Sequence, residues 1–320
     1  MKNLLRNIYF KTLFIRQIEK AIAEEYHKQE MRCPIHLSIG QELQAVVIAS
    51  FLKKNDIIFS NHRSHAHYLA KDGSAEAMIA EFYGKKIGCL SGKGGSMHLI
   101  DIKKKFYGSY PIVGSSIGLA TGVAFSQMRN NSKDITVSFF GDGATEEGIM
   151  HESFNMSNKF KLPILYVCEN NYFSIYTHIK ERQTSDNLTR FAKSHNVKFF
   201  RVKSYEIMKL LNFTKDAISH VRKSNPCFLQ IDTFRELEHC GPNNDDHLNY
   251  RNKKDLAFWR SHDPLTILKN LLLKKNIINE DKERRIIQSN KVKIYKIFEL
   301  AKRSNFDNPN NSNRNLYAKK

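Results

Sequence analysis

The sequence predicts an α/β fold in which a parallel central sheet carries helices on both faces. Three short runs rich in apolar, β-branched and aromatic residues are typical of strands buried in a parallel sheet, and they cover residues 135–140, 164–168 and 227–233. Helical patterns lie between these runs, and strands that alternate with helices form parallel sheets covered on both sides. The chain has 320 residues, enough to bury roughly three quarters of the unfolded surface in one domain.

The first half of the chain begins with two helical patterns. Apolar residues recur along one stripe over residues 4–28, which predicts an amphipathic helix, and residues 40–52 continue in the same style. Residues 55–73 are rich in His, Asn, Ser and Asp, so we expect strand ends and loops there. The many glycines of residues 84–96 predict a long loop over something that the backbone approaches closely.

The second half alternates strands with helices and ends in a polar tail. Residues 145–159 are predicted to be helical, with Glu146 and Glu147 in the first turn, where the helix dipole favours acidic residues. Residues 204–224 form a further predicted helix, and two or three charged helices follow Pro264. We expect one domain over residues 1–303 and a disordered tail over residues 304–320.

The net charge raises the question of a nucleic-acid partner. The chain carries 51 basic and 32 acidic residues, a net charge of +19, and such a balance suits nucleic acid or an anionic membrane. The basic residues are spread along the chain without a recognition motif, and Lys, Asn, Ile, Phe and Tyr are all plentiful. We therefore favour a compositional bias over specific binding of nucleic acid, which is a remote alternative.

Two further features concern the compartment. No run of 18 apolar residues is present and the first 30 residues lack the apolar core of a signal peptide, so we expect no membrane span and no export. The five cysteines are scattered without a Cys-x-x-Cys pair, which fits a reducing compartment. A cytoplasmic location is the expectation.

Polar residues follow two consecutive predicted strands. Asp142, between Gly141 and Gly143, ends the first, and Asn170-Asn171 ends the second. Ligands of doubly wound sheets gather at the carboxyl ends of strands, and a carboxylate with an amide oxygen suits Mg²⁺. The glycine turn and the following helix N-terminus suit a diphosphate. The sequence thus predicts a magnesium–diphosphate cofactor, and neither a P-loop nor a Gly-x-Gly-x-x-Gly after a strand is present.

Taken in order, several segments resemble the alpha subunit of the thiamine-diphosphate-dependent first component of 2-oxo acid dehydrogenases, of the pyruvate or acetoin type. The similarity runs from about residue 8 to about residue 251. The matching segments are residues 35–42 (Ile-His-Leu-Ser-Ile-Gly-Gln-Glu), 62–65 (His-Arg-Ser-His), 92–98 (Gly-Lys-Gly-Gly-Ser-Met-His), 112–114 (Ile-Val-Gly) and 141–171.

This resemblance implies the thiamine-diphosphate-binding fold and a set of site residues. The implied magnesium ligands are the side chains of Asp142 and Asn171 and the carbonyl of Phe173. The implied cofactor-binding residues are His62, Arg63, Val113, Asp142, Gly143, Ala144, Asn171 and Ile175, with Arg63, Gly143 and Ala144 at the diphosphate, His62 and Val113 at the aminopyrimidine ring, and Ile175 beneath the bent cofactor. The candidate catalytic residues are His36, His65 and His239, of which His36 and His239 match two histidines that face the substrate and the transferred group.

The resemblance also implies a reaction and partners. The enzyme would cleave the bond next to a ketone, in a 2-oxo acid such as pyruvate or in acetoin, and pass the acyl group to an acceptor such as lipoamide. The glutamate that activates the cofactor belongs to a separate beta subunit in this family. The implied partners are therefore a beta subunit in an α2β2 assembly and a lipoyl-bearing acyltransferase.

Departures from the family pattern keep an alternative open. Leu237 and Cys240 replace a histidine and a serine that are typical of pyruvate enzymes, and His62 stands where many members have tyrosine. The altered segment 238–251 motivates the alternative of a transketolase-like or decarboxylase subunit that acts on another ketone, such as a sugar-derived one, without lipoamide. A zinc cluster of His62, His65, His67 and His98 is disfavoured against a polar lining, because no cysteine or carboxylate accompanies these histidines.

Overall fold

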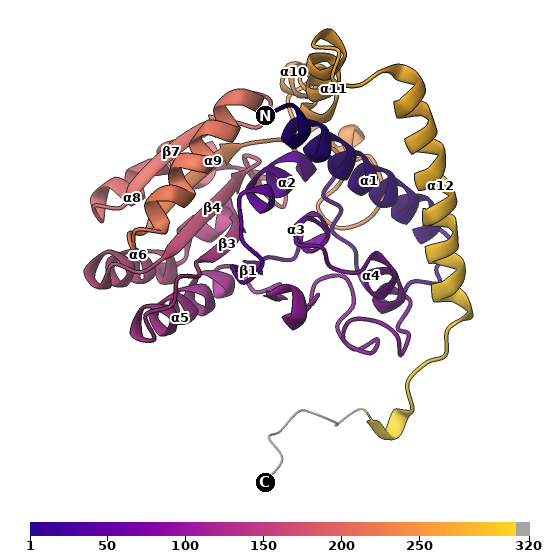
Figure 1. Cartoon of the computed structure of the whole chain (residues 1–320), viewed down its shortest axis with the longest axis horizontal. Helices are drawn as coiled ribbons and strands as arrows, with labels where there is room; N and C mark the ends of the chain where they lie inside the picture. Colours follow the sequence, from indigo (N-terminus) through magenta and orange to yellow (C-terminus); the bar gives the residue numbers. More distant parts are fainter. Residues whose placement is uncertain (312–320) are drawn as a thin grey trace.

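The computed structural model describes residues 1–311. At its centre is a six-stranded sheet of order β2-β1-β3-β4-β8-β7, in which every neighbouring pair runs parallel (Figure 1). The strands are β1 (Ile57–Ser60), β2 (Phe106–Ser109), β3 (Thr136–Gly141), β4 (Ile164–Asn170), β7 (Lys198–Lys203) and β8 (Cys227–Asp232). This arrangement confirms the predicted α/β fold with a parallel central sheet.

Helices connect the strands and frame the sheet. The α-helices are α1 (Lys2–Tyr26), α2 (Glu42–Ser50), α3 (His65–Ala70), α4 (Ala75–Phe82), α5 (Ser115–Arg129), α6 (Gly148–Phe160), α7 (Ile179–Arg182), α8 (Thr189–Ser194), α9 (Ile207–Val221), α10 (Lys253–Ser261), α11 (Pro264–Lys274) and α12 (Glu280–Arg303). Short 3₁₀ turns are η1 (Ile102–Lys104), η2 (Asp142–Glu146), η3 (Asp246–Leu248) and η4 (Pro309–Asn311), and a small antiparallel pair joins β5 (Phe173–Ser174) to β6 (Thr177–His178).

Alternate residues of the central strands enter two separate cores. In β4, Leu165 and Val167 belong to the core under α1, α2, α4, α9 and α12, whereas Tyr166 and Cys168 belong to the core under α5, α6 and α8. Successive side chains of a strand point to opposite faces of the sheet, so a strand covered on both faces is expected to be mostly apolar. This expectation agrees with the mostly apolar sequences of the central strands, and the two cores confirm the predicted helices on both faces.

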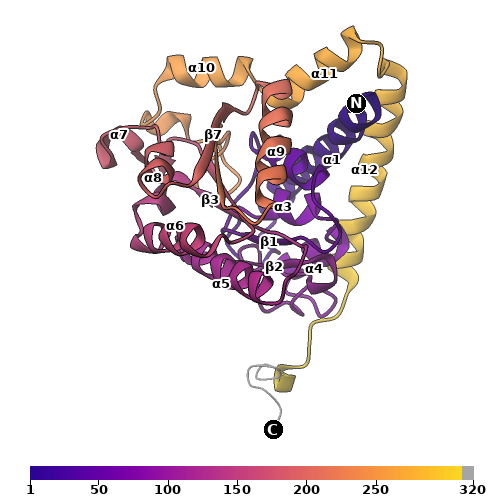
Figure 2. The ribbon, with the colours of Figure 1, turned by 60° about the vertical axis from the view of Figure 1, so that its left-hand side comes forward.

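The long helix α12 packs along α1 and α4 at one side of the molecule (Figures 1 and 2). Its N-terminal turn carries Glu283, which is buried, accepts a hydrogen bond from the Tyr9 hydroxyl and lies 2.9 Å from Lys269. At its other end Lys302 lies 2.8 Å from Glu25 of α1. None of the helices within residues 1–311 is sufficiently long and apolar to cross a membrane.

Two segments differ in detail from the sequence-based expectations. Residues 55–73 contain the strand β1 and the helix α3 as well as loops, and the helix expected from residue 145 begins at Gly148. The chain first forms the turn η2, in which the Thr145 hydroxyl donates to the carbonyl of Asp142 (2.7 Å). In the tail, the carbonyl of Asn305 accepts from the Lys86 amide (2.9 Å), and residues 312–320 lie outside the described residues.

Candidate active site

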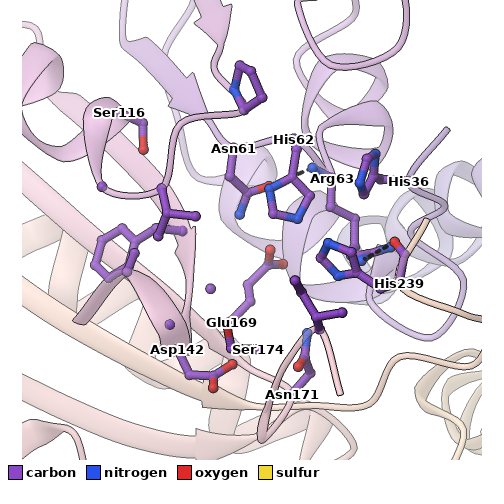
Figure 3. A pocket seen from close by; sticks show the side chains of 18 of the residues that line it. His36, Asn61, His62, Arg63, Ser116, Asp142, Glu169, Asn171, Ser174 and His239 are labelled. Carbon is purple, nitrogen blue, oxygen red and sulfur yellow. Dashed lines mark hydrogen bonds between the residues drawn. The ribbon is translucent and has the colours of Figure 1, made fainter. Parts of the chain in front are cut away.

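A pocket opens at the carboxyl ends of the strands, where the strand order changes direction between β1 and β3 (Figure 3). Such a switch point is where two neighbouring loops diverge and leave room for a ligand. Four strand ends supply lining residues, namely 61–63 after β1, 110–114 after β2, 142–144 after β3, and 171 with 173–175 after β4. His36 and His239 add to the lining from two further loops.

Asp142 and Asn171 emerge side by side in this pocket. Strands β3 and β4 are neighbours and Gly141 pairs with Glu169, and neighbouring strands lie about 4.8 Å apart. Asn171 lines the pocket, whereas the preceding Asn170 donates to Asp232 (3.0 Å) and thereby ties β4 to β8. The structure therefore brings Asp142 and Asn171 to one place, as their positions at strand ends predict, and Phe173, which only the resemblance implies, lines the same pocket.

The carboxylate of Asp142 is buried, and Arg182 at the end of α7 is its ion-pair partner. Burial raises the pKa of Asp142, because a carboxylate loses hydration when it is removed from water, and the positive charge of Arg182 opposes that rise. Arg182 also pairs with Glu146. The Asp142 carboxylate is thus buried next to a single guanidinium, and this guanidinium is shared with Glu146. The carboxylate oxygens therefore keep negative charge that can attract a metal ion.

The residues present fit a magnesium ion with a diphosphate. Asp142, Asn171 and the backbone of Phe173 offer hard oxygen ligands, the kind that Mg²⁺ prefers. An ideal Cβ on Gly141 would meet nothing within 4 Å, so there is open space beside the turn, whereas a Cβ on Gly143 would crowd the Ser174 hydroxyl at 3.0 Å. Ala144 and the half-exposed Val113 line the same pocket, as the resemblance implies.

Arg63 joins two loops beneath the pocket. Its buried guanidinium donates to the carbonyls of Leu37 (2.6 Å) and His239 (3.0 Å). Burial, followed by repulsion from Arg235, lowers its pKa to about 9, which leaves the group charged at neutral pH. Arg63 therefore supplies a positive charge to the pocket wall and holds the loop of His239 against that of His36.

Three histidine rings gather at one side of the pocket (Figure 3). The ring centroid of His36 lies 4.7 Å from that of His62 and 5.1 Å from that of His239. Burial and the nearby Arg63 lower the pKa of His36 to about 2 and the pKa of His62 and of His239 to about 3. At neutral pH all three rings are uncharged, and each has one nitrogen that can donate and one that can accept.

His65 does not reach the pocket, and its assignment as a catalytic residue is revised. The side chain is fully buried at the start of α3, with Nδ1 2.7 Å from Glu19 and Nε2 2.7 Å from Ser96. Both ring nitrogens are thus engaged by the core, and Glu19 also accepts from the amide of Ser38. Contact with a substrate is not supported by this placement, so we assign His65 a structural role.

Glu169 is a pocket residue that the sequence argument missed. Its Oε1 is buried and has no hydrogen-bond partner within residues 1–311, and Oε2 lies 3.2 Å from Nε2 of His67. His67 is held in turn by Ser60 (2.8 Å). The available signal was its position at the end of an apolar strand, directly before Asn170-Asn171.

Ile175 has a strained backbone that Arg235 supports. Its φ of 55° lies in the left-handed region, which is unusual for a β-branched residue. Both terminal nitrogens of Arg235 lie 3.3 Å from its carbonyl oxygen, and the Tyr250 hydroxyl accepts from the same guanidinium (2.6 Å). The sequence argument missed Arg235, whose only signal was its place four residues before His239.

Comparisons with known proteins point to one protein family. A family model described as "Dehydrogenase E1 component" matches residues 10–310. A protein of Rickettsia bellii named "Pyruvate dehydrogenase E1 component subunit alpha" is 30% identical over 307 residues, which cover 96% of this chain and 93% of that protein. Proteins of the same name from Rickettsia felis and Rhizobium meliloti are each 32% identical, covering 87% of this chain and 84% and 80% of their own lengths.

Proposed function

Because this chain belongs to the dehydrogenase E1 component family, we propose that it cleaves the bond beside the carbonyl of a 2-oxo acid such as pyruvate, or of acetoin. The acyl group then passes to lipoamide. Members of this family depend on thiamine diphosphate and Mg²⁺. The observation that supports this proposal is that Asp142 and Asn171 lie at the ends of adjacent strands and line one pocket. The names of the relatives point to pyruvate. No contact within residues 1–311 favours a transketolase-like subunit or a nucleic-acid-binding protein.

The proposed binding roles follow the pocket wall. Asp142, Asn171 and the carbonyl of Phe173 would hold Mg²⁺, and Arg63, Gly143 and Ala144 would lie at the diphosphate. His62 and Val113 would lie at the aminopyrimidine ring, with Ile175 beneath the cofactor. A guanidinium suits phosphate oxygens because it is planar and permanently charged, and the open space at Gly141 and the lack of a side chain at Gly143 let the backbone approach closely.

The electron sink needed to break the carbon–carbon bond is supplied by thiamine diphosphate when it is bound. His36 and His239, uncharged at neutral pH, would face the substrate and orient its oxygens by hydrogen bonds. His239 would take up a proton from the acceptor at its free nitrogen, and the imidazolium so formed would return that proton. Arg235 acts as a positioning residue, since it holds the carbonyl of Ile175 and lies 3.5 Å from Nδ1 of His239.

The family implies a beta subunit and a lipoyl-bearing acyltransferase as partners. We propose an α2β2 assembly in which the beta chain supplies the acid that activates the cofactor. We also propose a cytoplasmic location, which is supported by the five unpaired cysteines, Cys33, Cys89, Cys168, Cys227 and Cys240.

The test is an assay of the chain co-expressed with its beta chain. With Mg²⁺ and thiamine diphosphate, we expect release of CO₂ from pyruvate and transfer of the acetyl group to an isolated lipoyl domain. His239→Ala should slow the transfer, whereas His220→Ala, a matched change on α9 away from the pocket, should leave the rate unchanged. The proposal would be contradicted if the rate of acyl transfer did not depend on the lipoyl domain. It would also be contradicted if the pair of chains bound the cofactor but turned over neither pyruvate nor acetoin.

A further inference from the structure

The three pocket histidines come from three separate loops and form a compact group of nitrogens. His36 precedes α2, His62 follows β1 and His239 follows β8. One ring nitrogen from each lies within 4.8 Å of the other two (Figure 3). Within residues 1–311 this is the one group of three or more His, Cys, Asp or Glu side chains so placed.

The protonation and hydrogen bonding of these rings suit metal coordination. Their lowered pKa values keep the ring nitrogens free to donate a lone pair at neutral pH. Nδ1 of His36 is buried and has no hydrogen-bond partner among the described residues, and a buried polar atom normally has one. His36 therefore keeps a ring nitrogen to which the described residues supply no partner.

We propose that His36, His62 and His239 form a binding site for a transition-metal cation such as Zn²⁺. Three imidazoles with a fourth position left for water are an established ligand set for zinc. Zn–N bonds of about 2.0–2.1 Å place tetrahedral ligands about 3.4 Å apart, so the three nitrogens, which lie within 4.8 Å of one another, would move closer together to share one ion. The site is separate in chemistry from the oxygen ligands at Asp142, because Mg²⁺ avoids imidazole whereas Zn²⁺ accepts it.

The surroundings indicate that such a metal would exchange readily. Arg63 and Arg235 place positive charge next to the histidines, and this charge opposes a second cation. His62 and His239 are only partly buried, so the ligands remain accessible from the pocket. We therefore expect a reversible site rather than one that the fold requires.

A metal here has a functional consequence, and this consequence alone rests on the proposed function. His36 and His239 are the residues proposed to face the substrate, so a bound metal would occupy their nitrogens and compete with the substrate. Binding of the metal itself can be measured without any turnover, which keeps failure of the site distinguishable from failure of the proposed reaction.

The experiment is equilibrium dialysis of the full chain against Zn²⁺ in excess Mg²⁺, which keeps the oxygen ligands at Asp142 occupied. Co²⁺ replaces Zn²⁺ in a parallel measurement, because tetrahedral Co²⁺ absorbs visible light. We expect one Zn²⁺ per chain and a visible Co²⁺ band, both lost in His62→Tyr, a change that keeps a ring at this position. His220→Ala should retain both signals.

Two further variants test the ligand assignment. Cys240 is exposed and follows His239 directly, so Cys240→Ser should keep the metal if the three histidines alone are ligands. His239→Gln gives a second ligand deletion in case His62→Tyr fails to fold, as judged by circular dichroism. The proposal is overturned if the native chain binds no Zn²⁺, if folded ligand variants bind it as tightly as the native chain, or if Cys240→Ser abolishes binding.

Discussion

At the scale of single residues, Ile175 adopts a backbone conformation that its own side chain disfavours. A β-branched residue at positive φ costs of order 1–3 kcal/mol, yet Ile175 keeps φ at 55° with a side chain that is 49% exposed. Arg235 holds its carbonyl in place from the loop after β8. The fold thus accepts the strain at Ile175, and a contact from a second loop maintains it beside the pocket. This arrangement is expected of a residue whose position serves the site at some cost to the stability of the fold.

Ile175→Gly should therefore separate stability from activity. Glycine relieves the strain, so we expect the free energy of unfolding to stay constant or to rise by about 1 kcal/mol. Removal of the side chain should lower kcat of the pair with the beta chain by about tenfold, equivalent to about 1.4 kcal/mol in the barrier. Denaturant titration and steady-state kinetics measure the two effects, with Ile175→Val as the control that keeps a branched side chain. Full kcat in the glycine variant would remove Ile175 from the site.

At the scale of elements, a buried ionic network fixes the segment 235–251, from which His239 lines the pocket. Asp245 is buried and pairs with Arg251, and it accepts a hydrogen bond from the Tyr250 hydroxyl (2.5 Å). Arg251 also donates to the carbonyl of Arg235 (2.6 Å). The network therefore connects the far end of the loop to the residues that position Ile175 and His239.

Removal of one charge from this network should loosen the loop. Asp245→Asn leaves Arg251 without its buried partner, and such a loss typically costs about 3–5 kcal/mol. We expect lower stability and faster amide hydrogen exchange over residues 235–251. Asp246→Asn is the comparison variant, since Asp246 is partly exposed and pairs with Arg260 (2.7 Å) as well as with Arg251 (3.2 Å), and its loss should cost less than about 1 kcal/mol. Equal effects of the two changes would show that burial of Asp245 is not what fixes the loop.

At the scale of the whole molecule, the sequence predicts the centre of the sheet better than its edges. Strands β3, β4 and β8 are buried along nearly their whole length and are mostly apolar, so their pattern is readily detected. Strand β2 is an edge strand of four residues, and the opposite edge strand β7 includes exposed residues such as Lys198 and Phe199. Neither edge strand has the long apolar run that sequence analysis detects, because β2 is short and includes Gly108 and Ser109 and β7 includes charged residues.

Some residues of the candidate site are predictable from the strand pattern and others are not. Asp142 and Asn171 follow from their positions at strand ends, because parallel topology forces neighbouring ends together. His36 and His239 lie far apart in the sequence, and only the resemblance brought them into the site. His65 illustrates the limit of carrying roles along a segment: it is two residues from Arg63, but α3 begins at His65 and its side chain contacts Glu19 and Ser96 in the core instead.

The central claim is that Asp142 and Asn171 share one divalent ion. The most direct test is a crystal of this chain with its beta chain, thiamine diphosphate and Mn²⁺, examined by anomalous diffraction at the manganese edge. We predict one peak bonded to the Asp142 carboxylate, the Asn171 amide oxygen and the Phe173 carbonyl, and no such peak in Asp142→Ala. A manganese peak that touches none of these oxygens, or one that persists unchanged in Asp142→Ala, would contradict the account.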